Sequence, residues 1–145
     1  MNETKYGKYF VRNPTFDPNL ANIVEPQTGK VMTGRTRNNI FMANNLVPGS
    51  NIHLNLMWIY KVPSPNPFVL THSHQYDEIL FFLGTNPNNL EGLGGELTLE
   101  MGDEKHVVKT TTAVFIPKGL PHLLVYNRVD RPQMLVAISL SDEYK

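Results

Sequence analysis

The sequence predicts an all-β domain built as a sandwich or barrel of short antiparallel strands. Eleven prolines and ten glycines are spread along its 145 residues, and no stretch of ten or more residues keeps the three-to-four-residue apolar period of a helix. Short β-branched and aromatic runs recur instead, with turn residues between them. The length fits one domain with a single core.

The clearest strand pattern lies in residues 51–62, where polar and apolar side chains alternate. The apolar, even-numbered face is expected to point inward. Residues 96–101 alternate as well, and residues 133–140 are apolar on both faces, which predicts a central strand. The predicted strands cover residues 40–43, 51–62, 78–83, 96–101, 105–110, 113–116, 122–127 and 133–140.

The first third of the chain has few strand-forming residues and many Asn, Pro, Thr and Gly residues. We therefore expect residues 1–50 to form a partly irregular N-terminal arm, packed on the barrel or on a second subunit. Residues 51–145 are expected to form the barrel. The stretch from Gly84 to Gly95 is predicted to be a long loop between two strands.

Composition excludes several classes of function. Thirteen Lys and Arg residues balance thirteen Asp and Glu residues, so no charge field attracts nucleic acid or an anionic membrane. No apolar run approaches the roughly 18 residues that span a bilayer. The absence of cysteine excludes disulfides, thiolate zinc sites and a cysteine nucleophile. Residues 1–14 show no secretory pattern, and a soluble, cytoplasmic protein without nucleic-acid or membrane partners is expected.

A group of polar side chains interrupts the apolar pattern in "THSHQYDEIL". His72 and His74 are two residues apart, so on a strand both would point to the same side, roughly 6.6 to 6.8 Å apart. Glu78 would point to the same side as the two histidines if the strand is straight. If "QYD" forms a turn, Glu78 could still face the histidines from the next strand. His122 follows the turn "PKGLP", whose prolines restrict the backbone and would hold a metal ligand at a defined angle.

These stretches resemble the two motifs of the cupin family. The first motif, His-x-His followed by Glu, matches His72, His74 and Glu78, and its glycine follows one residue early as Gly84. The second motif, Pro-x-Gly-x-x-His, matches Pro117, Gly119 and His122, with its Asn one residue late as Asn127. The opening glycines of the two motifs are replaced by Asn66 and Thr111. The resemblance covers residues 66–127.

Cupins are small antiparallel jelly-roll β-barrels, typically dimeric, and many bind a metal through three histidines and a glutamate. The resemblance therefore implies an all-β jelly-roll barrel, a homodimer, and one divalent transition metal per chain, which could be Fe, Mn, Ni, Zn or Cu. It implies that the ligands are His72, His74, Glu78 and His122. The ligand set does not choose among these metals.

Strand parity also predicts a substrate pocket beside the metal. Residues that share a face with Glu78 or His122 would line it, and Tyr126 is the candidate hydrogen-bond donor to a metal ligand. Trp58 and Tyr60 are expected either in the core or in the pocket wall. The predicted pocket residues are Leu80, Phe82, Leu124, Tyr126, Trp58 and Tyr60.

Other polar residues are expected to play no direct part. His53 and His106 are predicted to lie on the surface. Asp77 would point to the opposite face of a strand from Glu78. It is therefore expected to be a solvated acid or a partner of a metal ligand and not a ligand itself. Arg35 and Arg37 could clamp a carboxylate, although arginines in loops are usually solvated.

The function predicted from these features is metal-dependent chemistry on a small molecule that coordinates the ion through oxygen. Dioxygenase, isomerase, decarboxylase and lyase reactions all remain open, since a fold does not select a reaction. The alternative is a non-catalytic protein that binds or senses a small molecule.

Overall fold

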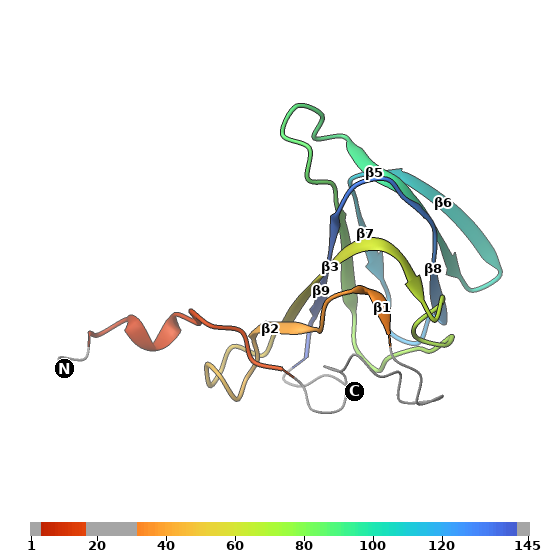
Figure 1. The fold of residues 1–145 in the computed structure, drawn as a ribbon. Coiled ribbons are helices and arrows are strands. Elements are labelled where there is room, and N and C mark those ends of the chain that lie inside the picture. Colours follow the sequence, from red (N-terminus) through yellow and green to blue (C-terminus); the bar gives the residue numbers. More distant parts are fainter. Residues whose placement is uncertain (1–3, 17–31, 142–145) are drawn as a thin grey trace.

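The computed structural model describes residues 4–16 and 32–141, and within them two antiparallel sheets form a jelly-roll β-barrel (Figure 1). The larger sheet has the order β1-β3-β9-β4-β7, with β2 also paired to β3, and the smaller sheet has the order β6-β5-β8. The elements are η1 (Gly7–Tyr9, a 3-10 helix), β1 (Thr33–Arg35), β2 (Asn39–Met42), β3 (His53–Ser64), β4 (Glu78–Leu83), β5 (Gly92–Met101), β6 (Glu104–Thr110), β7 (Thr112–Ile116), β8 (His122–Val129) and β9 (Gln133–Ser139).

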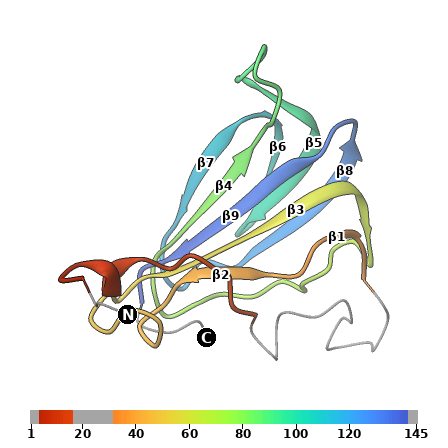
Figure 2. The same cartoon turned by 60° about the vertical axis from the view of Figure 1, so that its left-hand side comes forward.

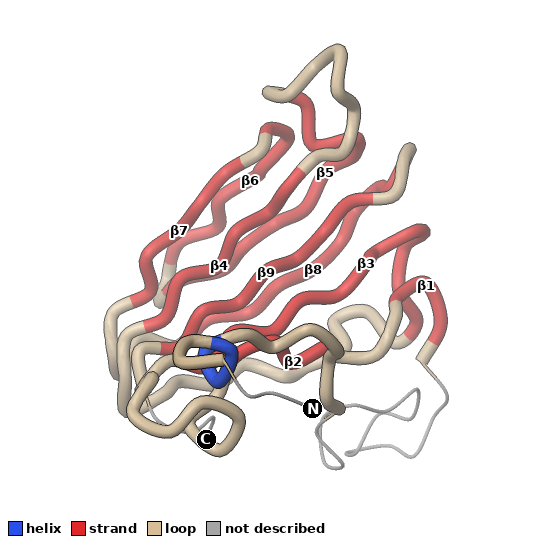
Figure 3. Tube along the Cα trace, turned by 90° about the vertical axis from the view of Figure 1, so that its left-hand side faces the viewer, coloured by secondary structure: helices blue, strands red, loops and turns tan. Residues whose placement is uncertain are grey.

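The predicted all-β fold is confirmed, and every predicted strand is present within a few residues of its expected ends. Strand β9, predicted to be central, lies between β3 and β4. Figures 2 and 3 show β7, β4, β9 and β3 side by side, with the smaller sheet behind them. This arrangement leaves the inner faces of the two sheets to form the core.

Two strand segments were not predicted. The short strand β1 has no recognisable pattern, and β5 begins at Gly92, inside the stretch predicted to be a loop. Glycine normally weakens a strand but is required where another backbone approaches closely. Gly95 is such a position, because a Cβ atom there would clash with the carbonyl oxygen of Arg128 on β8.

The predicted inward face of β3 is wrong. His53, Asn55, Met57 and Ile59 are buried, whereas Trp58 and Tyr60 are 39% and 49% exposed. The even face is apolar because it continues the apolar outer faces of β9 and β4, and the odd face carries polar groups because it lines the interior near the candidate site. Trp58 and Tyr60 therefore belong neither to the core nor to an internal pocket.

An apolar core fills the space between the sheets. Its side chains come from both sheets, and burial of such large apolar groups is the main stabilising contribution to a fold of this size. The apolar residues at 1% exposure or less are Ile59, Phe82, Leu93, Leu97, Leu99 and Ile116.

Part of the predicted N-terminal arm is built into the larger sheet, because β1 and β2 both pair with β3. Thr15 bridges Ile40 through two backbone hydrogen bonds of 3.0 and 2.8 Å, and the segment that precedes it extends away from the barrel (Figure 1). Residues 17–31 of the predicted arm lie outside the described residues. Among the described residues, no helix is long and apolar enough to cross a membrane.

Candidate metal centre

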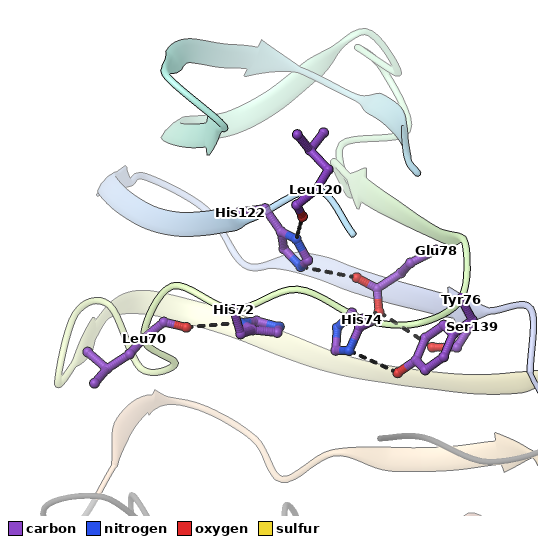
Figure 4. Close-up of polar contacts among 8 residues, drawn as sticks. All are labelled: Leu70, His72, His74, Tyr76, Glu78, Leu120, His122 and Ser139. Carbon is purple, nitrogen blue, oxygen red and sulfur yellow. Dashed lines mark hydrogen bonds and ion pairs between the residues drawn. The ribbon is translucent and has the colours of Figure 1, made fainter. Parts of the chain in front are cut away.

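Three histidines meet inside the barrel (Figure 4). His72 and His74 lie on the extended connection between β3 and β4, and His122 is the first residue of β8. The backbones of His72 and His122 exchange hydrogen bonds of 3.3 and 3.0 Å, which brings the two rings to a centroid distance of 4.5 Å. One ring nitrogen of each histidine lies within 4.8 Å of those of the other two. We call these residues the histidine cluster.

Each of the three rings has its Nδ1 in a hydrogen bond. In His72 and His122, Nδ1 donates to the carbonyl oxygen two residues earlier, at 2.9 and 3.0 Å. In His74, Nδ1 lies 3.1 Å from the Tyr76 hydroxyl oxygen. A carbonyl can only accept, so Nδ1 of His72 and His122 carries the proton and Nε2 keeps its lone pair. Metal-bound histidines usually have their second nitrogen held in this way.

Glu78 supplies a carboxylate beside the cluster. Its two oxygens lie 3.7 Å from Nε2 of His74 and 3.6 Å from Nε2 of His122. Burial raises the pKa of the Glu78 carboxyl to about 7, and a 3.4 Å hydrogen bond from the Ser139 hydroxyl opposes the increase. A divalent cation at the histidine cluster would compensate the buried negative charge.

His122 is biased toward the form that binds a metal. Burial lowers its pKa, the neighbouring His72 lowers it further, and the hydrogen bond to the Leu120 carbonyl partly opposes both effects. A neutral imidazole is the form that coordinates a metal. Protons therefore compete less strongly with a cation at His122 than at an ordinary exposed histidine.

The turn before His122 is hydrogen-bonded to the segment that contains His74 and Asp77. The Lys118 amide donates to Oδ1 of Asp77 at 2.9 Å, and the Gly119 amide donates to the His74 carbonyl at 2.8 Å. Gly119 has a φ of +82°, a conformation that other residues rarely adopt. Asp77 therefore holds the turn that positions His122, which agrees with the expectation of an acid that supports a metal ligand.

The residues that replace the two motif glycines have structural roles of their own. The Asn66 side chain forms two hydrogen bonds with the Tyr126 backbone, at 2.6 and 3.0 Å, and so holds the segment leading to His72 against β8. The Thr111 hydroxyl accepts a hydrogen bond of 2.9 Å from the Gly84 amide. Asn66 thus supports the segment that leads to the site, whereas Thr111 makes its contact at the opposite end of β4 from Glu78.

The predicted donor Tyr126 makes no hydrogen bond to a histidine. Its hydroxyl is buried, with no hydrogen-bond partner among the described residues, and its ring stacks on Phe68 with 6.3 Å between the ring centres. Burial raises the pKa of this phenol. Tyr126 shares a strand face with His122, but four residues of strand span roughly 13 Å. Tyr76 makes the contact instead, and the period of two that links residues 72, 74 and 78 would also have identified residue 76.

The predicted apolar pocket residues fall into two groups. Leu80 and Phe82 are buried inside the barrel, and Leu124 is partly buried against the same core. Trp58 and Tyr60 are exposed on the outer face of β3, so the structure excludes them from the interior. A pocket wall made of the first three residues stays a prediction.

Two further expectations about polar residues are wrong. His53 is buried rather than on the surface, whereas His106 is exposed as predicted and pairs with Glu104 at 2.9 Å. Arg35 is buried as well, with its guanidinium 4.6 Å from the Phe68 ring centre. Burial lowers the pKa of Arg35 to about 10. Its Nε and Nη2 donate to the Thr36 carbonyl and to Oδ1 of Asn38.

Replacing Tyr76 by phenylalanine is expected to weaken metal binding by about 10-fold to 100-fold while the fold is kept. The substitution removes only the hydroxyl that contacts Nδ1 of His74. Zinc titration of chelator-treated protein measures the effect. Tyr126→Phe is the matched control, because within residues 4–16 and 32–141 its hydroxyl has no hydrogen-bond partner. Equal affinities in the two variants would contradict the assignment.

Comparison with known proteins supports the fold. No family model matches the sequence, and no curated protein matches it. Among solved structures, a cupin-2 domain from Rhodospirillum rubrum is 13% identical with a TM-score of 0.53, over 79% of this chain and 64% of that one. An RmlC-like cupin from Shewanella frigidimarina is 11% identical with a TM-score of 0.52, over 100% of this chain and 95% of that one.

At these identities the similarity concerns the fold. The chain spans 64% of the length of the Rhodospirillum rubrum protein but 95% of the Shewanella frigidimarina protein. The architecture of both is that of the barrel described above. The chemistry of this chain has to be argued from its own residues.

Proposed function

The chain has the fold of a small cupin domain, and we propose that it uses this fold to hold one divalent transition metal. The proposed ligands are Nε2 of His72, His74 and His122 and the carboxylate of Glu78. One observation carries the proposal: all three imidazoles have Nδ1 in a hydrogen bond, one ring nitrogen of each lies within 4.8 Å of those of the other two, and Nε2 of His74 and His122 faces the buried Glu78 carboxylate. This arrangement leaves four donor groups for one cation.

The donor set limits the metal without selecting one. Imidazole and carboxylate ligands suit Fe, Mn, Ni, Zn and Cu in their divalent forms. Three neutral imidazoles and one carboxylate leave a divalent ion with a net charge near +1. Such an ion would keep positions open for an oxygen of a substrate or for dioxygen.

The function that this centre supports best is metal-dependent chemistry on a small organic molecule that coordinates the ion through oxygen. The bound metal would supply Lewis acidity or oxygen activation. The protein would hold the imidazoles in the ligand tautomer and would surround the ion with buried side chains. Dioxygenase, isomerase, decarboxylase and lyase reactions are the candidates.

Metal-loaded protein should be tested against a panel of keto acids, sugars and phenols for substrate loss and for oxygen consumption. Turnover of a panel member that stops when the metal is removed would support an enzyme. Thermal stabilisation by a panel member without any turnover would overturn the enzymatic reading and favour a binding or sensing protein.

We also propose that the chain forms a homodimer through the outer face of the larger sheet. On that face Leu56 pairs with Val136, which pairs with Phe81. The neighbouring row contains Leu54, Ile138 and Ile79. Trp58, Tyr60 and Phe115 on the same sheet are exposed. A continuous apolar sheet face of this kind is typical of an interface.

Replacing Val136 by glutamate is expected to shift a dimer to a monomer, because the substitution places a charge in the middle of this apolar face. Light scattering coupled to size-exclusion chromatography measures the mass. Val107→Glu makes the same change on β6 of the smaller sheet, at a side chain with 60% exposure, and should leave the mass unaltered. A monomeric parent protein would contradict the proposal.

A further inference from the structure

Polar side chains continue from Glu78 across the inner face of the larger sheet. Glu78 of β4 pairs with Ser139 of β9, and Ser139 pairs with His53 of β3. All three are buried, at 3%, 0% and 6% exposure. Asn55 is two residues further along the same face of β3 and is also buried, at 5%. We call His53 and Asn55 the β3 polar pair.

The β3 polar pair is unusual for its position. Farther along the same inner face, Met57 and Ile59 are apolar members of the core. Burial of a polar side chain is unfavourable unless it finds a partner, so apolar residues would be the simpler choice for packing. Ser139 already provides the hydrogen bond to the Glu78 carboxylate. Support of that carboxylate therefore does not explain a buried asparagine at position 55.

The β3 polar pair lies on the same interior surface as the proposed metal centre. Because adjacent strands are about 4.8 Å apart, the backbones of His53 and Glu78 are separated by roughly 10 Å. Both side chains project from the inner face of the sheet, and the histidine cluster lies beside Glu78. A small molecule bound to the metal through one end could therefore reach β3 with its other end.

We propose that the β3 polar pair binds hydroxyl groups of the metal-bound molecule, and that the ligand is a small hydroxylated acid. The inference rests on the proposed metal centre and specifies its substrate class. A side-chain amide carries donors and an acceptor and an imidazole carries two ring nitrogens, so both can form hydrogen bonds with a hydroxyl group. The carboxylate of such an acid supplies the oxygen that coordinates the cation.

The same residues argue against a second anionic group on the ligand. A second carboxylate would favour a cationic partner, and the β3 polar pair provides an amide and an imidazole. Arg35 is buried on β1, and its Nε and Nη2 donate to the Thr36 carbonyl and the Asn38 side chain. Neutral hydroxyl groups are therefore the better match for this part of the interior.

A comparison of gluconate with hexanoate distinguishes the contribution of the ligand's hydroxyl groups from that of its carboxylate. Both are six-carbon carboxylates, but only gluconate carries hydroxyl groups. Calorimetric titration of zinc-loaded protein is expected to show gluconate binding roughly tenfold more tightly than hexanoate. In Asn55→Leu, which replaces the amide by an apolar group of similar size, this preference should largely disappear while elemental analysis shows the zinc content unchanged.

Two further variants complete the test. Asn55→Ala repeats the test with a smaller side chain if the leucine variant does not fold. Asn88→Leu, at an exposed position, should keep the gluconate preference of the parent. An unchanged preference in folded Asn55 variants, or tighter binding of hexanoate by the parent, would overturn the proposal. Failure of the parent to bind zinc would overturn the metal centre itself, which distinguishes the two inferences.

Discussion

Replacing His72 and His122 together by alanine is expected to abolish tight binding of a transition metal. The double variant keeps His74 and Glu78 but loses two of the three imidazoles that gather at one point. Two donors cannot form the closed nitrogen-rich site that gives a divalent ion its affinity. The remaining binding should resemble that of an ordinary surface group. Calorimetric titration of chelator-treated protein with Zn²⁺ measures the change.

The control for this experiment is His106→Ala. His106 is exposed on β6 and interacts with Glu104 outside the barrel, so its loss should leave zinc affinity as in the parent. Circular dichroism verifies that the double variant retains its strands, which is expected because the hydrogen bonds between the His72 and His122 segments use backbone atoms. A folded double variant that binds zinc as tightly as the parent would refute the ligand assignment.

Replacing Glu78 by glutamine is expected to stabilise the metal-free protein at pH 8 and to have little effect at pH 5. Burial raises the pKa of Glu78 in the folded state from 4.5 to about 7. Below pH 4.5 the carboxyl is protonated in both the folded and the unfolded state. Between pH 4.5 and about pH 7 the folded state holds more protons than the unfolded state. The stability of the parent therefore falls as the pH rises through this range.

Above pH 7 the buried carboxylate is ionised in both states, and its full unfavourable contribution is present. The difference between a pKa of 4.5 and one of about 7 corresponds to roughly 3 kcal/mol of unfolding free energy, which glutamine would largely recover. Urea unfolding of parent and variant at the two pH values measures this difference. The interpretation fails if the variant is no more stable than the parent at pH 8.

The same variant should also bind metal more weakly than the parent. In the parent, zinc affinity is expected to rise as the pH approaches 7, because binding must displace the proton from Glu78. Glu78→Gln removes the anionic ligand, so the zinc affinity of the variant should be lower than that of the parent at every pH. A stabilised metal-free protein with weakened metal binding would identify Glu78 as a group retained for function at a cost in stability.

The sequence predicted the architecture well because strand patterns are local. The apolar runs that became β4, β8 and β9 are bounded by turn residues, and each appears where it was expected. The glycine-rich start of β5 could not be found in this way, because Gly95 is explained by the approach of the Arg128 carbonyl from another strand. That approach is a property of the assembled barrel.

The inner face of β3 was assigned wrongly for a reason that bears on function. The usual rule places the apolar face inward, but here the face that carries His53 and Asn55 is buried. Apolar residues such as Leu56 lie on the outer face, in register with Val136. Buried polar residues on the inner face of β3 and apolar residues on its outer face would fit the proposed internal site and the proposed dimer interface.

The candidate site was predicted as a set of residues, but its supporting contacts were not. The order of His72, His74, Glu78 and His122 in the chain indicated which side chains to expect, and three of them meet as a cluster with the fourth alongside. The roles of Tyr76 and Asp77 depend on contacts between segments that are distant or irregular. Those contacts require the folded chain.

Elemental analysis of the parent protein, purified without chelator, tests the metal centre most directly. Close to one divalent transition metal per chain is expected, with full reloading after chelation and dialysis against the metal. Protein that contains no transition metal and fails to take up Fe, Mn, Ni, Zn or Cu would contradict it. In that case the histidine cluster would be a hydrogen-bonded group without a metal.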